Sequence, residues 1–188
     1  ARDIVSANKD THAGHFDYKP FLRISMSGKT LGVIGTGRIG LEVIKIAQSL
    51  GMNSIGYDIY KNEKAAAELG FSYTALDELL KQSDVVTLHI PSTPETHHLL
   101  NSKTLTLLKS HTILVNTARG DLIDEAALIE QIDKFHAICL DVVEHEDSFT
   151  KDHPLLKYEN VIITPHCAFY SDEAVKIIAG ETERIISR

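Results

Sequence analysis

An arginine, an acidic segment and a histidine stand directly behind three apolar, β-branched runs of the sequence. Arg119 follows the first run, the segment 144–147 follows the second, and His166 follows the third. A guanidinium group can bind a carboxylate through two parallel hydrogen bonds. An imidazolium can give a proton to a ketone oxygen while hydride reaches the carbon, and a neighbouring carboxylate favours that charged form. Reduction of a 2-keto acid requires this set of residue types.

A glycine-rich segment earlier in the chain indicates a binding site for a dinucleotide. Residues Gly35–Gly40 have the pattern Gly-x-Gly-x-x-Gly, follow an apolar run and open the predicted helix Ile39–Leu50. The first glycine permits a tight turn, the second lets backbone N–H groups approach a pyrophosphate, and the third lets the helix pack closely on the strand. The helix N-terminus adds unpaired N–H groups and a partial positive charge. We therefore predict a dinucleotide site rather than a plain glycine turn.

The next predicted strand ends at Asp58, which bears on the choice of dinucleotide. Asp58 lies 18 residues beyond Gly40, where a carboxylate would accept hydrogen bonds from the hydroxyl groups of an adenosine ribose. The same carboxylate would repel a 2′-phosphate, and residues 59–61 include no arginine. The sequence therefore favours NAD over NADP. NADP stays a minor alternative because the positively charged Lys61 follows Asp58 closely.

The composition is that of a globular protein and argues against two classes of partner. Of the 188 residues, 43% are hydrophobic and 24% are charged, which is ordinary for one domain with a substantial core. The formal net charge of −7 and the lack of basic runs argue against binding to nucleic acid or to an anionic membrane. The sequence shows no membrane-spanning stretch and no signal peptide, and Cys139 and Cys167 lie in or beside apolar runs. We expect a cytoplasmic protein with reduced thiols.

Short β-branched runs alternate with segments of helical periodicity along most of the chain. The runs predicted as strands are 30–35, 53–58, 84–90, 111–116, 136–142 and 160–165. The segments predicted as helices between them are 39–50, 64–70, 76–82, 104–109 and 125–132. The runs are almost continuously apolar, as expected of strands buried on both faces. The alternation predicts an α/β protein with a doubly wound parallel sheet, which is a Rossmann-type dinucleotide-binding fold.

Several motifs occur in an order that resembles the D-isomer-specific 2-hydroxyacid dehydrogenase family over nearly the whole chain. Besides the glycine segment and Asp58, these motifs are 88–96, 116–120, 140–146 and 164–168. The resemblance implies that Arg119 binds the substrate carboxylate and that His166 is the general acid and base. It also implies that Glu146 is the partner of the histidine and that Asp141 contacts the nicotinamide carboxamide.

The predicted cofactor site combines the glycine segment with the residues that the resemblance adds. Its members are Gly35, Thr36, Gly37, Arg38, Ile39, Gly40, Asp58, His89, Pro91, Thr96, Thr117, Ala118, Arg119, Asp141, His166 and Ala168. The chain departs from the family at Asp147, where many members have proline. Glu144 therefore stays open as an alternative partner for the histidine.

The resemblance also implies how the chain is organised. We expect one NAD-binding domain, residues 1–188, without the substrate domain that completes the site in the family. Residues 1–29 would form a hinge helix and an irregular arm, 30–170 the Rossmann core, and 171–188 a returning helix. The isolated chain would then be almost inactive. Homodimers in this family form mainly through the cofactor domain, and we expect the arm to take part in such a dimer.

The residues after His166 bear on the substrate. Phe169 and Tyr170 resemble the D-lactate dehydrogenase branch, which favours pyruvate and D-lactate or a slightly larger aliphatic acid. The glyoxylate, hydroxypyruvate and phosphoglycerate branches usually have smaller residues there, and they remain alternatives. An NAD(H)-sensing corepressor of the same family, and oxidation of formate or phosphite, are further alternatives.

No metal site is predicted from the histidines and carboxylates. The pair His97–His98 is interpreted as solvent-exposed loop residues. The acidic segment 144–147 has no second histidine or cysteine cluster at a supporting spacing.

Overall fold

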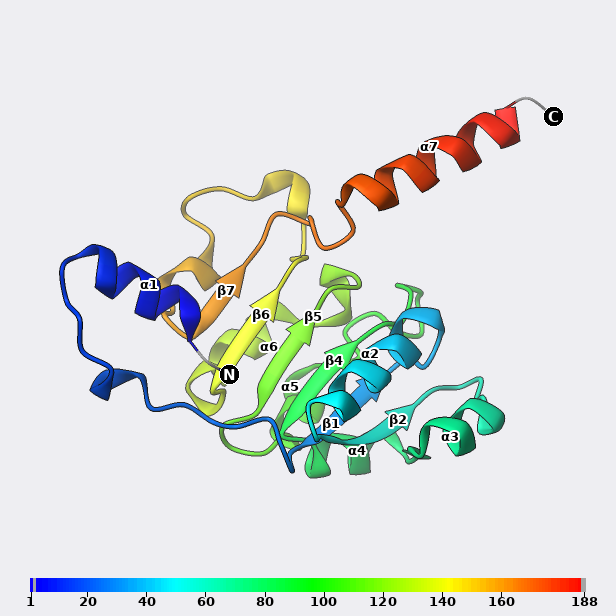
Figure 1. The fold of residues 1–188 in the computed structure, drawn as a ribbon, viewed down its shortest axis with the longest axis horizontal. Coiled ribbons are helices and arrows are strands. Elements are labelled where there is room, and N and C mark those ends of the chain that lie inside the picture. The colour runs from blue at the N-terminus through cyan, green and yellow to red at the C-terminus, as the bar shows by residue number, and fades with distance from the viewer. Residues whose placement is uncertain (2, 187–188) are drawn as a thin grey trace.

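The computed structural model describes residues 1 and 3–186 and consists of a parallel sheet with helices on both faces (Figure 1). The strands are β1 (Thr30–Ile34), β2 (Asn53–Tyr57), β3 (Ser72–Tyr73), β4 (Val85–Leu88), β5 (Ile113–Asn116), β6 (Ala137–Leu140) and β7 (Val161–Ile163). The α-helices are α1 (Ile4–His12), α2 (Arg38–Ser49), α3 (Glu63–Leu69), α4 (Leu76–Gln82), α5 (Ser102–Thr106), α6 (Glu125–Glu130) and α7 (Asp172–Ile186). Short 3₁₀ helices are η1 (Lys19–Phe21), η2 (Gly120–Leu122), η3 (Ile132–Lys134), η4 (Glu146–Ser148) and η5 (Pro154–Lys157).

The order of strands in the sheet is β3-β2-β1-β4-β5-β6-β7, and all neighbouring strands are parallel. The order reverses between β1 and β4, which is the point where open α/β sheets bind ligands. The predicted α/β class and doubly wound sheet are confirmed.

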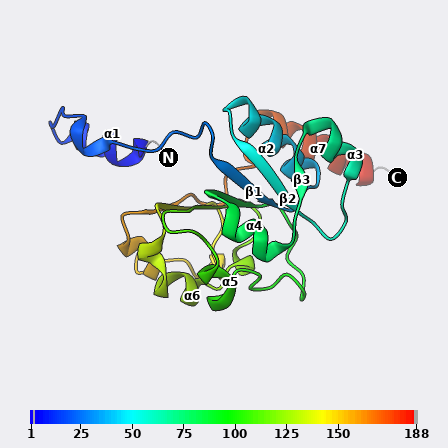
Figure 2. The same cartoon turned by 90° about the horizontal axis from the view of Figure 1, so that it is seen from below.

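Two layers of helices cover the sheet and enclose two cores (Figure 2). α2 and α3 lie on one face, while α4, α5 and α6 lie on the other. α2 turns its buried residues Gly40, Ile44 and Ala47 toward the sheet at helical spacing, which explains why this segment forms an amphipathic helix. The larger core lies under α4–α6 and includes the fully buried Leu114 and Leu128. α7 leads away from the body of the domain (Figure 1).

The strand register places the ends of five strands in one row. Ile34, Leu88, Asn116, Leu140 and Ile163 are successive Cα partners across β1, β4, β5, β6 and β7. The next residue of each strand therefore leaves the sheet at the same edge, which is the carboxyl edge. The chain segments that follow these strands contain most of the predicted site.

The structure differs from the sequence prediction mainly in short elements. β3 was not predicted, because its two residues carry no apolar run and are strand only through pairing with β2. The predicted segment 104–109 is helical over Ser102–Thr106. The predicted arm contains η1. Residue 2 of the predicted hinge helix and residues 187–188 of the predicted returning helix lie outside the described residues.

Within the part of the chain that the structure describes, no helix combines the length and the hydropathy needed to cross a membrane.

Candidate active site

The glycine loop between β1 and α2 has the shape that a pyrophosphate requires. Gly35 has a φ of 94°, which disfavours a side chain, and a Cβ at Gly40 would lie 2.0 Å from the carbonyl oxygen of Gly35. A Cβ at Gly37 would meet no atom within 4 Å, so this side of the loop is open. Gly37 is also the N-cap of α2, and no side chain caps the helix there. The first-turn N–H groups of α2 are therefore available to phosphate oxygens, and the loop fits the diphosphate of NAD.

Asp58 leaves the end of β2 next to this loop. Its Oδ2 accepts hydrogen bonds from the backbone N–H of Thr36 at 2.7 Å and from the Thr36 hydroxyl at 3.2 Å. Its Oδ1 accepts a hydrogen bond from the backbone N–H of Tyr60 at 2.9 Å. These contacts hold a carboxylate beside the glycine loop, where the predicted ribose would lie.

A pocket of about 350 Å³ brings together predicted cofactor residues from the first turn of α2 and from the loops that follow β4 and β5. Its lining consists of Ile39, His89, Ile90, Pro91, Ser92, Thr117, Ala118 and Arg119. The Nε2 atom of His89 lies 3.0 Å from the hydroxyl of Thr87. Burial lowers the pKa of His89, so this wall of the pocket is neutral at pH 7.

The turn that carries Arg119 is fixed by a buried asparagine. Asn116 is the last residue of β5, and its amide nitrogen donates a hydrogen bond to the backbone oxygen of Arg119 at 2.7 Å. Its amide oxygen accepts a hydrogen bond from the backbone N–H of Ala118 at 3.0 Å. This role of Asn116 was not predicted, although a polar residue at the end of an apolar run was a usable signal.

His166 and Glu146 form an ion pair at the same edge. The Nδ1 atom of His166 lies 2.9 Å from Oε2 of Glu146, and both side chains are about two-fifths exposed. This contact leaves Nε2 of His166 on the other side of the ring, where it can exchange a proton with a bound molecule. His166 has a φ of 50°, an uncommon conformation for a residue with a side chain. Such strained backbone is found preferentially at functional sites.

Asp141 holds the turn that carries His166. Its carboxylate accepts hydrogen bonds from the Thr164 hydroxyl and from the backbone N–H groups of Cys167 at 3.0 Å and Ala168 at 2.8 Å. Burial acts to raise the pKa of Asp141, but these hydrogen bonds outweigh it and hold the pKa below its ordinary value. The backbone oxygen of Asp141 also accepts a hydrogen bond from the N–H of His166 at 2.8 Å. In this structure Asp141 therefore orders the histidine turn.

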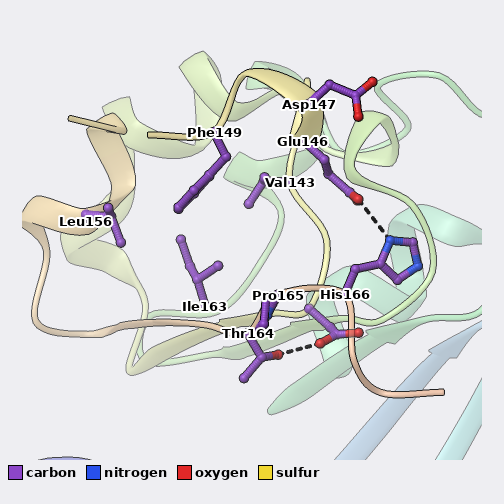
Figure 3. Close-up of a pocket in the computed structure, with 10 residues that line it drawn as sticks. Val143, Glu146, Asp147, Phe149, Leu156, Ile163, Thr164, Pro165 and His166 are labelled. Carbon is purple, nitrogen blue, oxygen red and sulfur yellow. Dashed lines mark hydrogen bonds and ion pairs between the residues drawn. The ribbon is translucent and has the colours of Figure 1, made fainter. Parts of the chain in front are cut away.

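A second pocket, of about 430 Å³, opens beside the histidine (Figure 3). Glu146, Asp147 and His166 line it together with Asp141 and Thr164, and the remaining wall is formed by Val143, Phe149, Leu156, Ile163 and Pro165. An acid–base pair thus borders a largely apolar hollow.

Two of the acidic and polar candidates have other partners. Oε1 of Glu144, the alternative partner expected for His166, instead lies 2.8 Å from Nε2 of His98. Thr96 donates a hydrogen bond to the backbone oxygen of Pro91 at 2.8 Å and shapes its own loop. Thr96 is not among the residues that line either of the two pockets.

The family model described as "D-isomer specific 2-hydroxyacid dehydrogenase, NAD binding domain" matches residues 1–168. The chain belongs to this family. The match confirms the predicted family and the predicted cofactor, NAD.

Similar proteins within the D-2-hydroxyacid dehydrogenases come from several branches. A D-3-phosphoglycerate dehydrogenase of Methanocaldococcus jannaschii is 44% identical, over 99% of this chain and 36% of its own length. The structure of D-lactate dehydrogenase from Aquifex aeolicus with NAD and lactic acid matches with a TM-score of 0.90 and 37% identity, over 99% of this chain and 61% of that one. The apo-structure of D-lactate dehydrogenase from Escherichia coli matches with a TM-score of 0.90 and 39% identity, over 99% of this chain and 59% of that one. The chain therefore spans 36% to 61% of the length of these three dehydrogenases.

Asp58 leads to a prediction about cofactor choice in this dehydrogenase domain. We expect NADPH to bind at least about tenfold more weakly than NADH, because the Asp58 carboxylate would face the additional phosphate. Asp58→Asn, which removes the charge, should reduce this difference. Calorimetric titration measures both dissociation constants, and the exposed Asp133→Asn serves as the matched control. Equal dissociation constants for the two cofactors in the unaltered chain would contradict the role of Asp58.

Asp141 leads to a prediction about stability and pH. Because the folded state lowers the pKa of Asp141, its contribution is complete at neutral pH and is lost as the pH falls below about 4. We expect Asp141→Asn to lower the free energy of unfolding by about 1.5–3 kcal/mol at pH 7, and by less in acid. Urea unfolding at pH 7 and at a pH below about 4 tests this prediction, with the exposed Asp133→Asn as the control. A loss of the same size at both pH values would refute it.

Proposed function

We propose that the protein containing this chain is an NAD-dependent enzyme that reduces a small 2-keto acid to the D-2-hydroxy acid. The observation that carries this proposal is the ion pair of His166 with Glu146 at the edge of the sheet that also holds Arg119 and the glycine loop. Family membership supports the same reaction type.

Each side chain has one task in this reaction. The guanidinium of Arg119 binds the carboxylate of the keto acid and fixes its orientation. Nε2 of His166 gives a proton to the keto oxygen, and Glu146 holds the imidazole ring in place through Nδ1. NADH, when bound at the glycine loop, would supply the hydride to the keto carbon. In the oxidative direction, His166 takes the proton from the hydroxyl group.

Pyruvate and D-lactate, or a slightly larger aliphatic pair, are the proposed substrates. The ring of Phe169 stands edge-on to that of His166 at 6.0 Å between centroids, which places an apolar surface close to the reacting atoms. The similarity to two D-lactate dehydrogenase structures agrees with this choice. Because the chain is also similar to a D-3-phosphoglycerate dehydrogenase, D-3-phosphoglycerate is the second candidate substrate.

We further propose that the substrate lobe lies outside these residues and that the protein is cytoplasmic. The first proposal is supported by the lengths of the relatives, because the chain spans only 36% to 61% of them. The second follows the two free cysteines, Cys139 and Cys167.

The reaction and the domain proposal are tested together. We expect the 188-residue chain to bind NADH but to show almost no turnover of pyruvate, because correct positioning of the reactants contributes about 7–11 kcal/mol. In a longer protein that carries this chain and a substrate lobe, His166→Gln should lower kcat at least about 100-fold. Turnover by the chain within about tenfold of the longer protein would contradict the domain proposal. NADH binding without turnover in the longer protein would favour a corepressor.

We also propose a homodimer formed through this domain. In the arm, Phe16 is 96% exposed and Leu22 is 89% exposed. Beside it, the face of β5–β7 opposite α6 leaves Val115 and Ala137 only partly buried. Isolated large apolar side chains are normal on a surface, but a group of them next to an open sheet face indicates an interface.

This proposal predicts that the arm determines the oligomeric state. We expect Phe16→Ser and Leu22→Ser together to convert a dimer into a monomer, as measured by sedimentation equilibrium. Ile59→Ser, at another exposed aliphatic residue, is the control and should leave the dimer intact. A monomeric unaltered chain at high concentration would contradict the proposal.

A further inference from the structure

Two histidines and a glutamate from separate loops meet beside the active site. His97 and His98 belong to the loop after β4, and Glu144 belongs to the loop after β6. One potential ligand atom from each residue lies within 4.8 Å of the other two. Nε2 of His98 is 2.8 Å from Oε1 of Glu144, and the two imidazole rings stack with centroids 3.9 Å apart. From the sequence, the two histidines were expected to be solvent-exposed loop residues, and no contact with Glu144 was predicted.

The backbone on both sides of this cluster is held in place. His98 has a φ of 49°, and its N–H donates a hydrogen bond to the backbone oxygen of Asp121 at 2.8 Å. Its own backbone oxygen accepts a hydrogen bond from the Asn101 amide at 3.0 Å. The N–H of Glu144 donates a hydrogen bond to the carboxylate of Glu125 at 2.7 Å. Two of the three side chains therefore start from fixed positions, while the exposed His97 can adjust its rotamer.

We propose that His97, His98 and Glu144 bind a divalent transition-metal ion of the Zn²⁺ type. Two imidazoles with one carboxylate are the ligands that such borderline ions prefer, whereas Mg²⁺ and Ca²⁺ prefer oxygen alone. Metal–ligand bonds of about 2.0–2.1 Å in a tetrahedral site separate neighbouring ligand atoms by about 3.3 Å. Nε2 of His98 and Oε1 of Glu144, now 2.8 Å apart, need to separate by only about 0.5 Å to admit an ion, and rotation of His97 would bring in the third ligand atom. Water would occupy the fourth position.

This site is distinct from the acid–base pair, because Glu146 faces His166 and Glu144 faces His98. A bound ion would join the loop after β4, which lines the cofactor pocket, to the loop that carries Glu146. The consequence would be a chain that resists unfolding better in the presence of the ion, since a ligand that binds only the folded state stabilises it.

Calorimetric titration of the untagged chain with ZnCl₂ and with MgCl₂ tests the site. We expect binding of one Zn²⁺ and no comparable binding of Mg²⁺. His97→Ala should weaken Zn²⁺ binding at least about tenfold and remove the rise in Tm that Zn²⁺ produces. His12→Ala, at an exposed histidine of α1, should change neither.

The same titration contains the results that would overturn the proposal. The proposal is wrong if Zn²⁺ does not bind to the chain, or if His97→Ala binds Zn²⁺ with unchanged affinity. Loss of binding in Cys167→Ser with retention in His97→Ala would place the ion at the acid–base pair and would equally refute the site. His98→Ala is a second variant, and its circular dichroism spectrum shows whether it is folded. If it does not fold, His97→Ala decides, because that side chain is exposed.

Discussion

Parallel pairing in a single register is the constraint on which the rest of the molecule depends. Because the last residues of five strands are direct partners, the chain leaves the sheet five times along one line. The glycine loop, the Arg119 turn and the His166 turn lie along the same edge of the sheet for this reason, before any of their side chains interact. A slip of one residue in β6 would move Ile138 and Leu140 out of the core and would displace the turn that contains Glu146.

Buried polar side chains then give the turns their shape. Asn116 and Asp141 are both almost inaccessible to solvent, and each uses its side-chain oxygen atoms to accept hydrogen bonds from backbone N–H groups. Burying such groups is unfavourable unless they are satisfied, and here the partners belong to the turns themselves. The turns therefore keep their conformation through contacts with the sheet, while Arg119 and His166 remain available to a bound molecule.

The features that depend on local sequence could be predicted, whereas those that depend on distant contacts could not. Six strands followed from β-branched runs long enough to be buried on both faces, and the glycine pattern placed the cofactor loop. β3 could not be found in this way, since only its pairing with β2 makes it a strand. Arg119 and His166 were predictable as residues behind strands. The family resemblance, rather than the local sequence, implied Glu146 as the partner of His166, and the two side chains lie 2.9 Å apart. The pairing of Glu144 with His98 was not predicted, because it depends on the path of the loop before η4.

The single row of strand ends also has a mechanical consequence. Neighbouring strands are joined by main-chain hydrogen bonds and covered by two cores, so thermal displacements carry them together as one body. The turns that hold Arg119 and His166 are attached to these strands by Asn116 and Asp141, and they share that common displacement. The spacing between the backbones of the two turns is thus set by the stiffness of the sheet. If the proposed substrate lobe closes over a bound acid, the displacement must therefore occur in that lobe and at its connections rather than within the sheet.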